Sequence, residues 1–226
     1  MPELPRCRLA TWRDVDAWAD RVASEVRAHR AVPGTIVGLT RGGWVPARLL
    51  GDRLGVKRIV SLRAQHWGVT ATRTGAAELT EGLSGPVAGQ TVLVADDITD
   101  TGESLALAVN HVRAAGPERV ESATFLHIAH STYRPTYFAE EIPREAWAWI
   151  VFPWNYWEDL VALAQRAAQE SGRGIDRVRA TLRDACGLDV PRTDLERVAA
   201  LVPIAAERAR PTRGSPARLR SARRAT

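Results

Sequence analysis

The alternation of apolar and polar positions divides the chain into short elements of two kinds. Short stretches rich in apolar and β-branched residues, typical of strands, occur at 35–39, 58–62, 91–95, 119–128 and 146–152. Helical spacing occurs at 12–30, 44–54 and 103–115, where Thr11 is a good N-cap residue and Gly55 and Gly116 are suited to end helices. Strands that alternate with helices predict an α/β fold with a mainly parallel, twisted sheet flanked by helices.

The pattern changes beyond Pro153, where only helical periods remain. Two sequences have the spacing of capping boxes, Asn155-x-x-Glu158 and Thr193-x-x-Glu196. Helices are therefore expected at 160–170, 176–186 and 193–208, the last one divided by Pro203. The pattern predicts a core over 1–157, a helical extension over 158–208 and a disordered tail over 209–226.

Composition and charge restrict the class of protein further. A hydrophobic fraction of 45% with 25% charged residues is ordinary for a globular protein. No apolar run reaches the roughly 18 residues that a membrane span needs, and Met1 to Arg8 lacks the apolar region of a signal peptide. Cys7 and Cys186 are the only cysteines, which argues against a disulfide scaffold. We expect a cytoplasmic protein without membrane contact.

The basic character of the chain belongs to its tail. Residues 208–226 hold seven arginines and no acid, so without them the net charge of +5 becomes about −2. The main part of the chain therefore does not indicate nucleic-acid binding. The tail is interpreted as a solvated arm, with a weak contact to nucleic-acid phosphates as the alternative.

The most informative segment is 92–104, Val-Leu-Val-Ala-Asp-Asp-Ile-Thr-Asp-Thr-Gly-Glu-Ser. An unpaired carboxylate is costly to bury, so Asp96 and Asp97 are expected at the carboxyl end of the strand, where open α/β sheets bind ligands. The helix predicted from Glu103 directs backbone N–H groups at the same place, and such a helix start suits a phosphate. Two acids beside a phosphate cradle indicate a phosphorylated sugar as ligand.

This segment resembles the thirteen-residue signature of the type I phosphoribosyltransferases, which use 5-phosphoribosyl-1-diphosphate (PRPP). The resemblance covers roughly residues 10–160 and implies the type I phosphoribosyltransferase fold. It implies that Asp96 and Asp97 hold the ribose hydroxyls and serve as the metal residues for Mg²⁺, either directly or through those hydroxyls or water. It implies that Asp100 acts on the ring nitrogen of the acceptor. The 5′-phosphate loop would comprise Thr99, Asp100, Thr101, Gly102, Glu103 and Ser104.

A second loop follows the first predicted strand. Arg41-Gly42-Gly43 combines a positive charge with two glycines that let backbone amides approach an anion. By resemblance, Thr40, Arg41, Gly42 and Gly43 bind the diphosphate, with a cis peptide bond between Thr40 and Arg41. The polar stretch over 64–85, which contains His66, Arg73 and Glu78, matches the position of the family's flexible lid.

The acceptor side is indicated by tryptophans. The string Trp-Ala-Trp-Ile-Val-Phe-Pro-Trp over 147–154 resembles a segment of the xanthine–guanine and hypoxanthine phosphoribosyltransferases of prokaryotes. The resemblance implies that Trp149 stacks on a purine and that the backbone of Ile150 meets the purine edge. In a strand, Trp147 and Trp149 would point the same way. Trp154 and Trp157 are interpreted as packing residues of the hood that covers the base.

One departure concerns the lysine that relatives place after the fourth strand to hold the purine 6-oxo group. This chain has His127-Ile128-Ala129-His130-Ser131 there. One alignment puts His130 at the position of the lysine and another puts Ile128 there. A neutral histidine donates or accepts according to its tautomer. His130 is therefore our candidate base contact.

Together these features predict transfer of phosphoribose from PRPP to a nucleobase, a 6-oxopurine above all (hypoxanthine, guanine or xanthine), with Mg²⁺ as cofactor. The expected assembly is a homo-oligomer, a dimer or tetramer. Two alternatives stay open. One is a regulator that binds PRPP or a nucleotide, and the other is a phosphoribosyltransferase for a pyrimidine or a specialised biosynthetic acceptor.

Overall fold

A computed structural model describes residues 3–30, 32–66 and 77–204. Its main element is a six-stranded sheet in the order β4-β3-β2-β5-β6-β7, in which only the β3–β4 pair is antiparallel. The strands are β2 (Thr35–Thr40), β3 (Ile59–His66), β4 (Ala77–Glu81), β5 (Thr91–Thr99), β6 (Arg119–Ile128) and β7 (Tyr137–Ile142). The predicted α/β fold with a mainly parallel sheet is confirmed.

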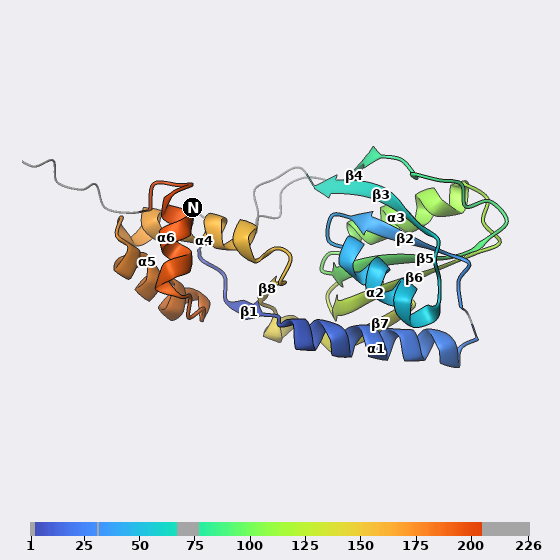
Figure 1. The fold of residues 1–226 in the computed structure, drawn as a ribbon, viewed down its shortest axis with the longest axis horizontal. Helices are drawn as coiled ribbons and strands as arrows, with labels where there is room; N and C mark the ends of the chain where they lie inside the picture. The colour runs from blue at the N-terminus through green and yellow to red at the C-terminus, as the bar shows by residue number, and fades with distance from the viewer. Residues whose placement is uncertain (1–2, 31, 67–76, 205–226) are drawn as a thin grey trace, which may run out of the picture.

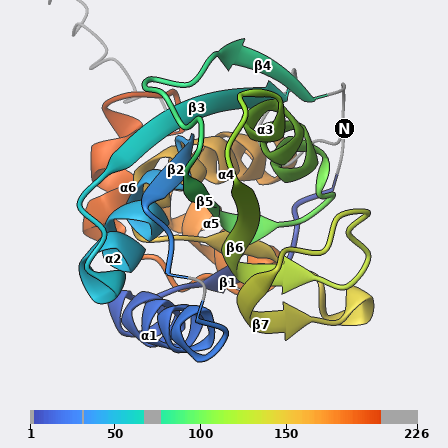
Figure 2. The same cartoon turned by 90° about the vertical axis from the view of Figure 1, so that its right-hand side faces the viewer.

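Helices cover both faces of this sheet (Figure 2). Helices α1 (Trp12–Ala28) and α2 (Trp44–Leu54) lie on one face, and α3 (Glu103–Ala114) lies on the other. Strand β2, which is covered on both faces, reads as a nearly continuous apolar run, whereas β6 also buries the polar residues Ser122, Thr124 and His127. Among the described residues, no helix is long and apolar enough to cross a membrane.

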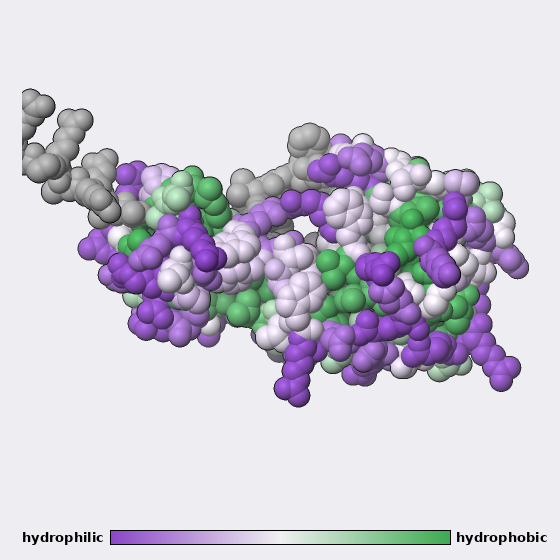
Figure 3. All heavy atoms as spheres, in the orientation of Figure 1, coloured by the Kyte–Doolittle hydropathy of each residue, from purple (hydrophilic) through white to green (hydrophobic). Residues whose placement is uncertain are grey.

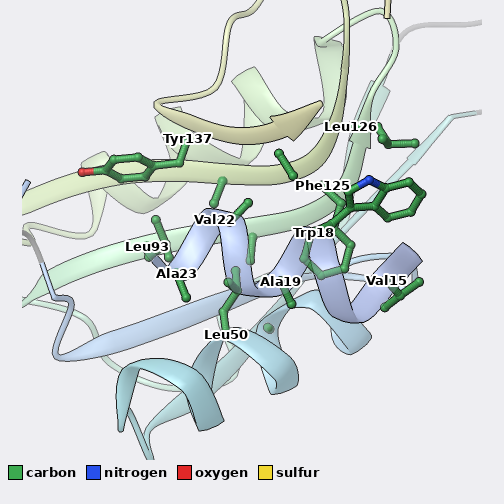
Figure 4. Packing of buried hydrophobic residues seen from close by; sticks show 14 of the residues in the cluster. Val15, Trp18, Ala19, Val22, Ala23, Leu50, Leu93, Phe125, Leu126 and Tyr137 are labelled. Carbon is green, nitrogen blue, oxygen red and sulfur yellow. The ribbon is translucent and has the colours of Figure 1, made fainter. Parts of the chain in front are cut away.

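Helix α1 shows how the apolar spacing creates the core. Thr11 caps the helix in a reciprocal capping box with Asp14, as the sequence predicts for this N-cap. Trp18 and Val22 then face the sheet, where Phe125 and Leu93 meet them (Figure 4). All four side chains are at most 7% exposed, so this contact removes large apolar surfaces from water.

The helical extension forms a second body with its own core. It contains α4 (Tyr156–Ser171), α5 (Ile175–Thr181), a π-helical turn (Leu182–Cys186) and α6 (Arg192–Ala199), which lie to the left in Figure 1. A narrower waist joins it to the α/β part (Figure 3). A small parallel sheet of β1 (Cys7–Leu9) and β8 (Trp149–Val151) lies in this waist. Leu4, just before β1, and Val151, on β8, belong to the core cluster of the extension. Both chain segments of the waist therefore contribute to that core.

Several local predictions were wrong. The run 146–152 does not add a strand to the main sheet; a 3-10 turn (Arg144–Ala146) precedes the short β8. The sixth strand is instead β7, which the sequence reading missed, as it missed β1 and β4. Asn155 is the N-cap residue of α4, as predicted, but its side chain makes no capping bond, and Thr193 is no cap because α6 begins earlier, after Pro191. Residues 67–76 of the expected lid lie outside the described residues, and its flanks form the β3–β4 hairpin.

Candidate functional site

The expected site residues come together where β2, β5 and β6 end. These parallel neighbours direct their carboxyl ends to the same edge of the sheet, the usual ligand side of such folds. Asp96 and Asp97 lie near the carboxyl end of β5, which extends to Thr99 rather than ending at Ala95 as predicted. The loop after β2 and the segment after β6 flank them.

The two adjacent carboxyl groups have unusual electrostatics. Burial, together with the charge of Asp97, raises the pKa of Asp96 well above its usual value. Burial raises the pKa of Asp97 to about 6, although a hydrogen bond from Trp154 opposes this shift. The indole Nε1 of Trp154 lies 3.2 Å from Asp97 Oδ2. Within the described residues, neither acid has a cationic partner that holds its pKa at the usual level, and a ligand rich in hydroxyl donors would suit both.

The loop after β2 lies directly on Asp97. A Cβ atom built on Gly42 would be 2.4 Å from Asp97 Oδ2, so only glycine leaves room for this carboxylate. A Cβ on Gly43 would be 2.3 Å from the carbonyl oxygen of Ala95. The peptide bond between Thr40 and Arg41 is cis, as the family resemblance implied. The backbone of the expected diphosphate loop is thus in contact with Asp97, one of the two acids expected to bind the ribose.

Arg41 is the charged residue of this loop. Its guanidinium lies 2.5 Å from Glu158 Oε2 at the start of α4. Both side chains are at least half exposed, so the ion pair adds little stability and can yield to an anionic ligand. Arg41 therefore reaches across the waist toward the extension.

The loop over 99–104 turns into α3 through Gly102, which has φ +88°. A Cβ there would be 2.4 Å from Ser131 Oγ, so both space and backbone angle favour glycine. The backbone N–H of Thr132 donates to the carbonyl oxygen of Thr101 and holds the loop in place. The hydroxyl of Thr99 is buried and bonds Thr124, which leaves Thr99 only its backbone for a ligand. Thr101, Glu103 and Ser104 surround the start of α3, where backbone N–H groups can receive a phosphate.

Asp100 occupies the centre of the acceptor side. Its Oδ1 is 3.1 Å from the indole Nε1 of Trp147 and 3.0 Å from His130 Nε2. Ile128, by contrast, is fully buried in the core, which leaves it no access to a ligand. The side chain after β6 that meets Asp100 is thus His130. His127 is also buried, and burial lowers its pKa.

The tryptophans are arranged differently from the prediction. Trp147 and Trp149 do not point the same way, because Trp147 packs against the sheet's core cluster and Trp149 against the cluster of the extension. Trp149 donates its backbone N–H to Arg6, and Val151 accepts from Ala10. Alternation along β8 therefore turns the peptide groups of Ile150 to the edge opposite β1. That edge has no strand partner in the described part of the chain.

Sequence reasoning missed three contributors to this region. Trp154, expected only to pack, stacks on Phe152 with centroids 4.8 Å apart and also holds Asp97. Trp147 holds Asp100. Asp159 on α4 is 3% exposed, and this burial raises its pKa to about 7. A hydrogen bond from the Trp149 side chain lowers the pKa, whereas the charges of Glu158 and Asp97 raise it. A turn at 152–155, closed by the Asn155 N–H that donates to the Phe152 carbonyl oxygen, precedes α4, whose Glu158 meets Arg41 of the loop after β2.

The acids of the site fit a metal held mainly by substrate. In the ranges 3–30, 32–66 and 77–204, no group of three or more His, Cys, Asp or Glu side chains is arranged to hold a metal ion. Mg²⁺ usually keeps several waters and binds through one or two carboxylates together with substrate phosphates. Asp96 and Asp97 offer that smaller contribution.

Comparison with known proteins identifies the class. The sequence model of the phosphoribosyl transferase domain matches residues 9–160, which include every element of the site described above. This chain belongs to the phosphoribosyltransferase family. It is an enzyme that transfers a phosphoribosyl group, and the predicted type I fold is confirmed.

Solved structures show the same fold. A purine phosphoribosyltransferase from Pyrococcus horikoshii is 25% identical, with a TM-score of 0.56 over 66% of this chain and 93% of that one. The Helicobacter pylori xanthine-guanine-hypoxanthine phosphoribosyltransferase is 20% identical, with a TM-score of 0.54 over 66% and 94%. A Neisseria gonorrhoeae protein with bound ppGpp is 17% identical, with a TM-score of 0.56 over 68% and 92%. The matched part is the α/β body, so the extension is additional to it.

Proposed function

We propose that this enzyme transfers phosphoribose from PRPP to a 6-oxopurine and forms a nucleoside monophosphate and pyrophosphate. The observation that carries the proposal is the contact of Asp100 with both His130 and Trp147. It places a carboxylate and a versatile hydrogen-bonding ring next to the phosphate loop, where an acceptor base would meet the ribose. The likeness to the Pyrococcus purine enzyme, at 25% identity, supports a purine acceptor.

Each part of the site has a task in this reaction. The Thr101–Ser104 backbone would bind the 5′-phosphate, and Thr40 to Gly43 the diphosphate. Asp96 and Asp97 would accept hydrogen bonds from the ribose hydroxyls and so fix C1′. Holding both reactants in line contributes much of the rate, because orientation converts an encounter into an intramolecular step.

Proton handling would belong to Asp100. When the C1′–O bond to diphosphate breaks and the ring nitrogen of the base attacks C1′, the base must lose its N–H proton. Asp100 would accept it while Trp147 holds the carboxylate in place, after His130 has turned to the base. Asp96 and Asp97, together with oxygens of the substrate, would help to hold Mg²⁺, which would supply charge withdrawal from the leaving group.

The acceptor itself would lie between Trp149 and the end of β6. Trp149 would stack on the base, the free peptide groups of Ile150 would meet its edge, and His130 would take the place of the family's lysine at the 6-oxo group. His130 Nε2 would then have to leave Asp100 and donate to that oxygen. The replacement of a permanent cation by a histidine also favours one alternative, a specialised acceptor without a 6-oxo group.

Pyrophosphate release with a panel of bases tests the proposal. The protein is incubated with Mg²⁺ and PRPP and with hypoxanthine, guanine, xanthine, adenine, uracil or orotate. Release confined to the 6-oxopurines is the expected result. Release with uracil or orotate alone would contradict the purine assignment, and PRPP binding without release on any base would favour a regulator.

A further inference from the structure

The fold brings the two cysteines of the chain together, although they lie far apart in the sequence. Cys7 lies on β1, and Cys186 is the last residue of the π-helical turn in the extension. Cys186 is fully buried in the core cluster of the extension, and the half-buried Cys7 packs against the same cluster. The two side chains are hydrogen-bonded to each other. Both thiols are free, and neither has a task in the reaction described above.

The segment before β1 is held on the extension by bonds that do not involve the cysteines (Figure 1). Arg6 Nη1 lies 3.4 and 3.3 Å from the carbonyl oxygens of Asp184 and Ala185, the two residues before the buried cysteine. Arg166 of α4 donates to the carbonyl oxygen of Glu3 over 2.6 Å. These contacts keep the two thiols side by side whether or not a bond joins them.

We propose that Cys7 and Cys186 form a reversible disulfide that ties the amino-terminal segment to the helical extension. A disulfide requires two cysteines whose side chains already face each other at short distance, and a pair of hydrogen-bonded thiols meets this requirement. The bond would close most of the chain into one loop. Such a long loop restricts the unfolded chain strongly, so the folded form gains stability.

A low-molecular-weight disulfide such as oxidised glutathione supplies the oxidising equivalents. Cys7, the more exposed thiol, attacks one sulfur of this reagent and releases the first glutathione. Cys186 then attacks the Cys7 sulfur of the mixed disulfide and releases the second glutathione. The S–S bond of the reagent breaks, the bond between Cys7 and Cys186 forms, and both cysteine protons leave on the released thiols. The reagent gains the two electrons that the cysteines lose.

The electrostatics of the pair favour Cys186 as the second nucleophile. The hydrogen bond that it shares with Cys7 lowers the pKa of Cys186, and so do the charges of Arg166 and Arg6, while burial and the charge of Glu170 oppose them. The same hydrogen bond, together with burial, raises the pKa of Cys7. Because the thiolate is the attacking form, the first exchange is the slow step and closure by Cys186 follows quickly.

Oxidation of the folded, full-length protein tests the proposal. The protein is incubated with oxidised glutathione or with dithiothreitol and compared by intact mass, thiol titration and non-reducing electrophoresis. We expect a monomeric product that has lost both thiols and the mass of two hydrogens, and that dithiothreitol converts back. Peptide mapping should show Cys7 linked to Cys186. The oxidised form should melt about 5–10 °C above the reduced form.

Two variants serve as controls, each compared with itself under oxidising and reducing conditions. Cys7→Ser removes the more exposed sulfur and Cys186→Ala the buried one, and neither should melt higher after oxidation. The mass measurement on the wild type needs no variant. Thiols that both persist, glutathione that stays on Cys7, a disulfide between two copies of the chain, or a closed bond that leaves the melting temperature unchanged would each overturn the proposal. None of these outcomes depends on which base the enzyme accepts.

Discussion

The phosphate side and the acceptor side of this site are built in different ways. The phosphate side consists of two loops, each a continuous stretch of sequence directly after a strand, with Gly42, Gly43 and Gly102 in positions that hold no larger residue. The acceptor side is assembled from β6, β8 and α4, and its contacts join residues far apart in the chain, such as Trp147 with Asp100 and Trp154 with Asp97. Local backbone geometry defines one half, and packing between distant segments defines the other.

This difference teaches where changes of specificity can occur. A loop whose backbone binds a phosphate tolerates few residues, because the fit depends on glycines and on chain direction. Side chains that meet across a waist can be exchanged one at a time, and we interpret His130 as such an exchange for the lysine that the family resemblance led us to expect. The following predictions test both halves, from the largest expected effect to the smallest.

The replacement Asp100→Asn should have the largest effect on turnover, because Asp100 lies where the phosphate side meets the acceptor side. The amide still fits between Trp147 and His130 but cannot take up a proton. We expect kcat to fall by about 10²- to 10⁴-fold with little change in thermal stability. Steady-state kinetics and a melting curve measure both, and unchanged turnover would remove Asp100 from the mechanism.

Asp159 should make the stability of the folded protein depend on pH. Burial raises the pKa of Asp159 to about 7 in the folded protein, so ionising this carboxyl group lowers the free energy of unfolding. This loss of stability is complete above pH 7 and absent below the ordinary pKa near 3.8. Trp149, Glu158, Asp97 and Cys7 face or influence it. Asp159→Asn should therefore gain stability over the wild type as the pH rises from 4 to 8, by at most about 4 kcal/mol. Urea unfolding at several pH values tests this, and a difference independent of pH would contradict it.

Gly42→Ala tests the phosphate side alone. The added Cβ displaces the carboxylate of Asp97, whose oxygen lies 2.4 Å from that position. We expect PRPP binding to weaken by about 10²-fold, as misplacement of a binding group by roughly 1 Å can cost that much, with nucleobase binding to the enzyme little affected. Gly34→Ala, whose added Cβ would be 3.9 Å from its nearest neighbour at the amino end of β2, is the control. Equal PRPP affinities for both variants would show that this contact does not matter.

The smallest effect is expected on the acceptor side, from Trp149. Trp149→Leu removes the ring and should raise the KM for the base by about 30-fold, which corresponds to about 2 kcal/mol, the middle of the usual range of about 1–3 kcal/mol for aromatic stacking. Trp149→Phe keeps a ring and should change this KM much less. Similar values for both variants would show that Trp149 only packs against the extension.

The same division explains what the sequence could predict. The apolar runs that became β2, β5 and β6, the glycine that opens α3 and the cis peptide at Arg41 follow from local pattern or motif, and they were confirmed. The relation of Trp147 to Trp149 was predicted wrongly, because the alternation of a regular strand was applied to a segment that turns at Pro143–Ala146 before β8. Asp159 gave no sequence signal, since its burial depends on how α4 packs against the waist.

Substitution at position 130 tests the central claim most directly, that His130 completes a 6-oxopurine site around Asp100. The rate of pyrophosphate release from PRPP is measured with guanine and with adenine for the wild type and for His130→Lys. We predict that the wild type uses guanine and not adenine, and that His130→Lys, which restores the family's residue, keeps this preference. Loss of the guanine preference in His130→Lys, or a wild type that accepts neither purine although PRPP binds, would contradict this account.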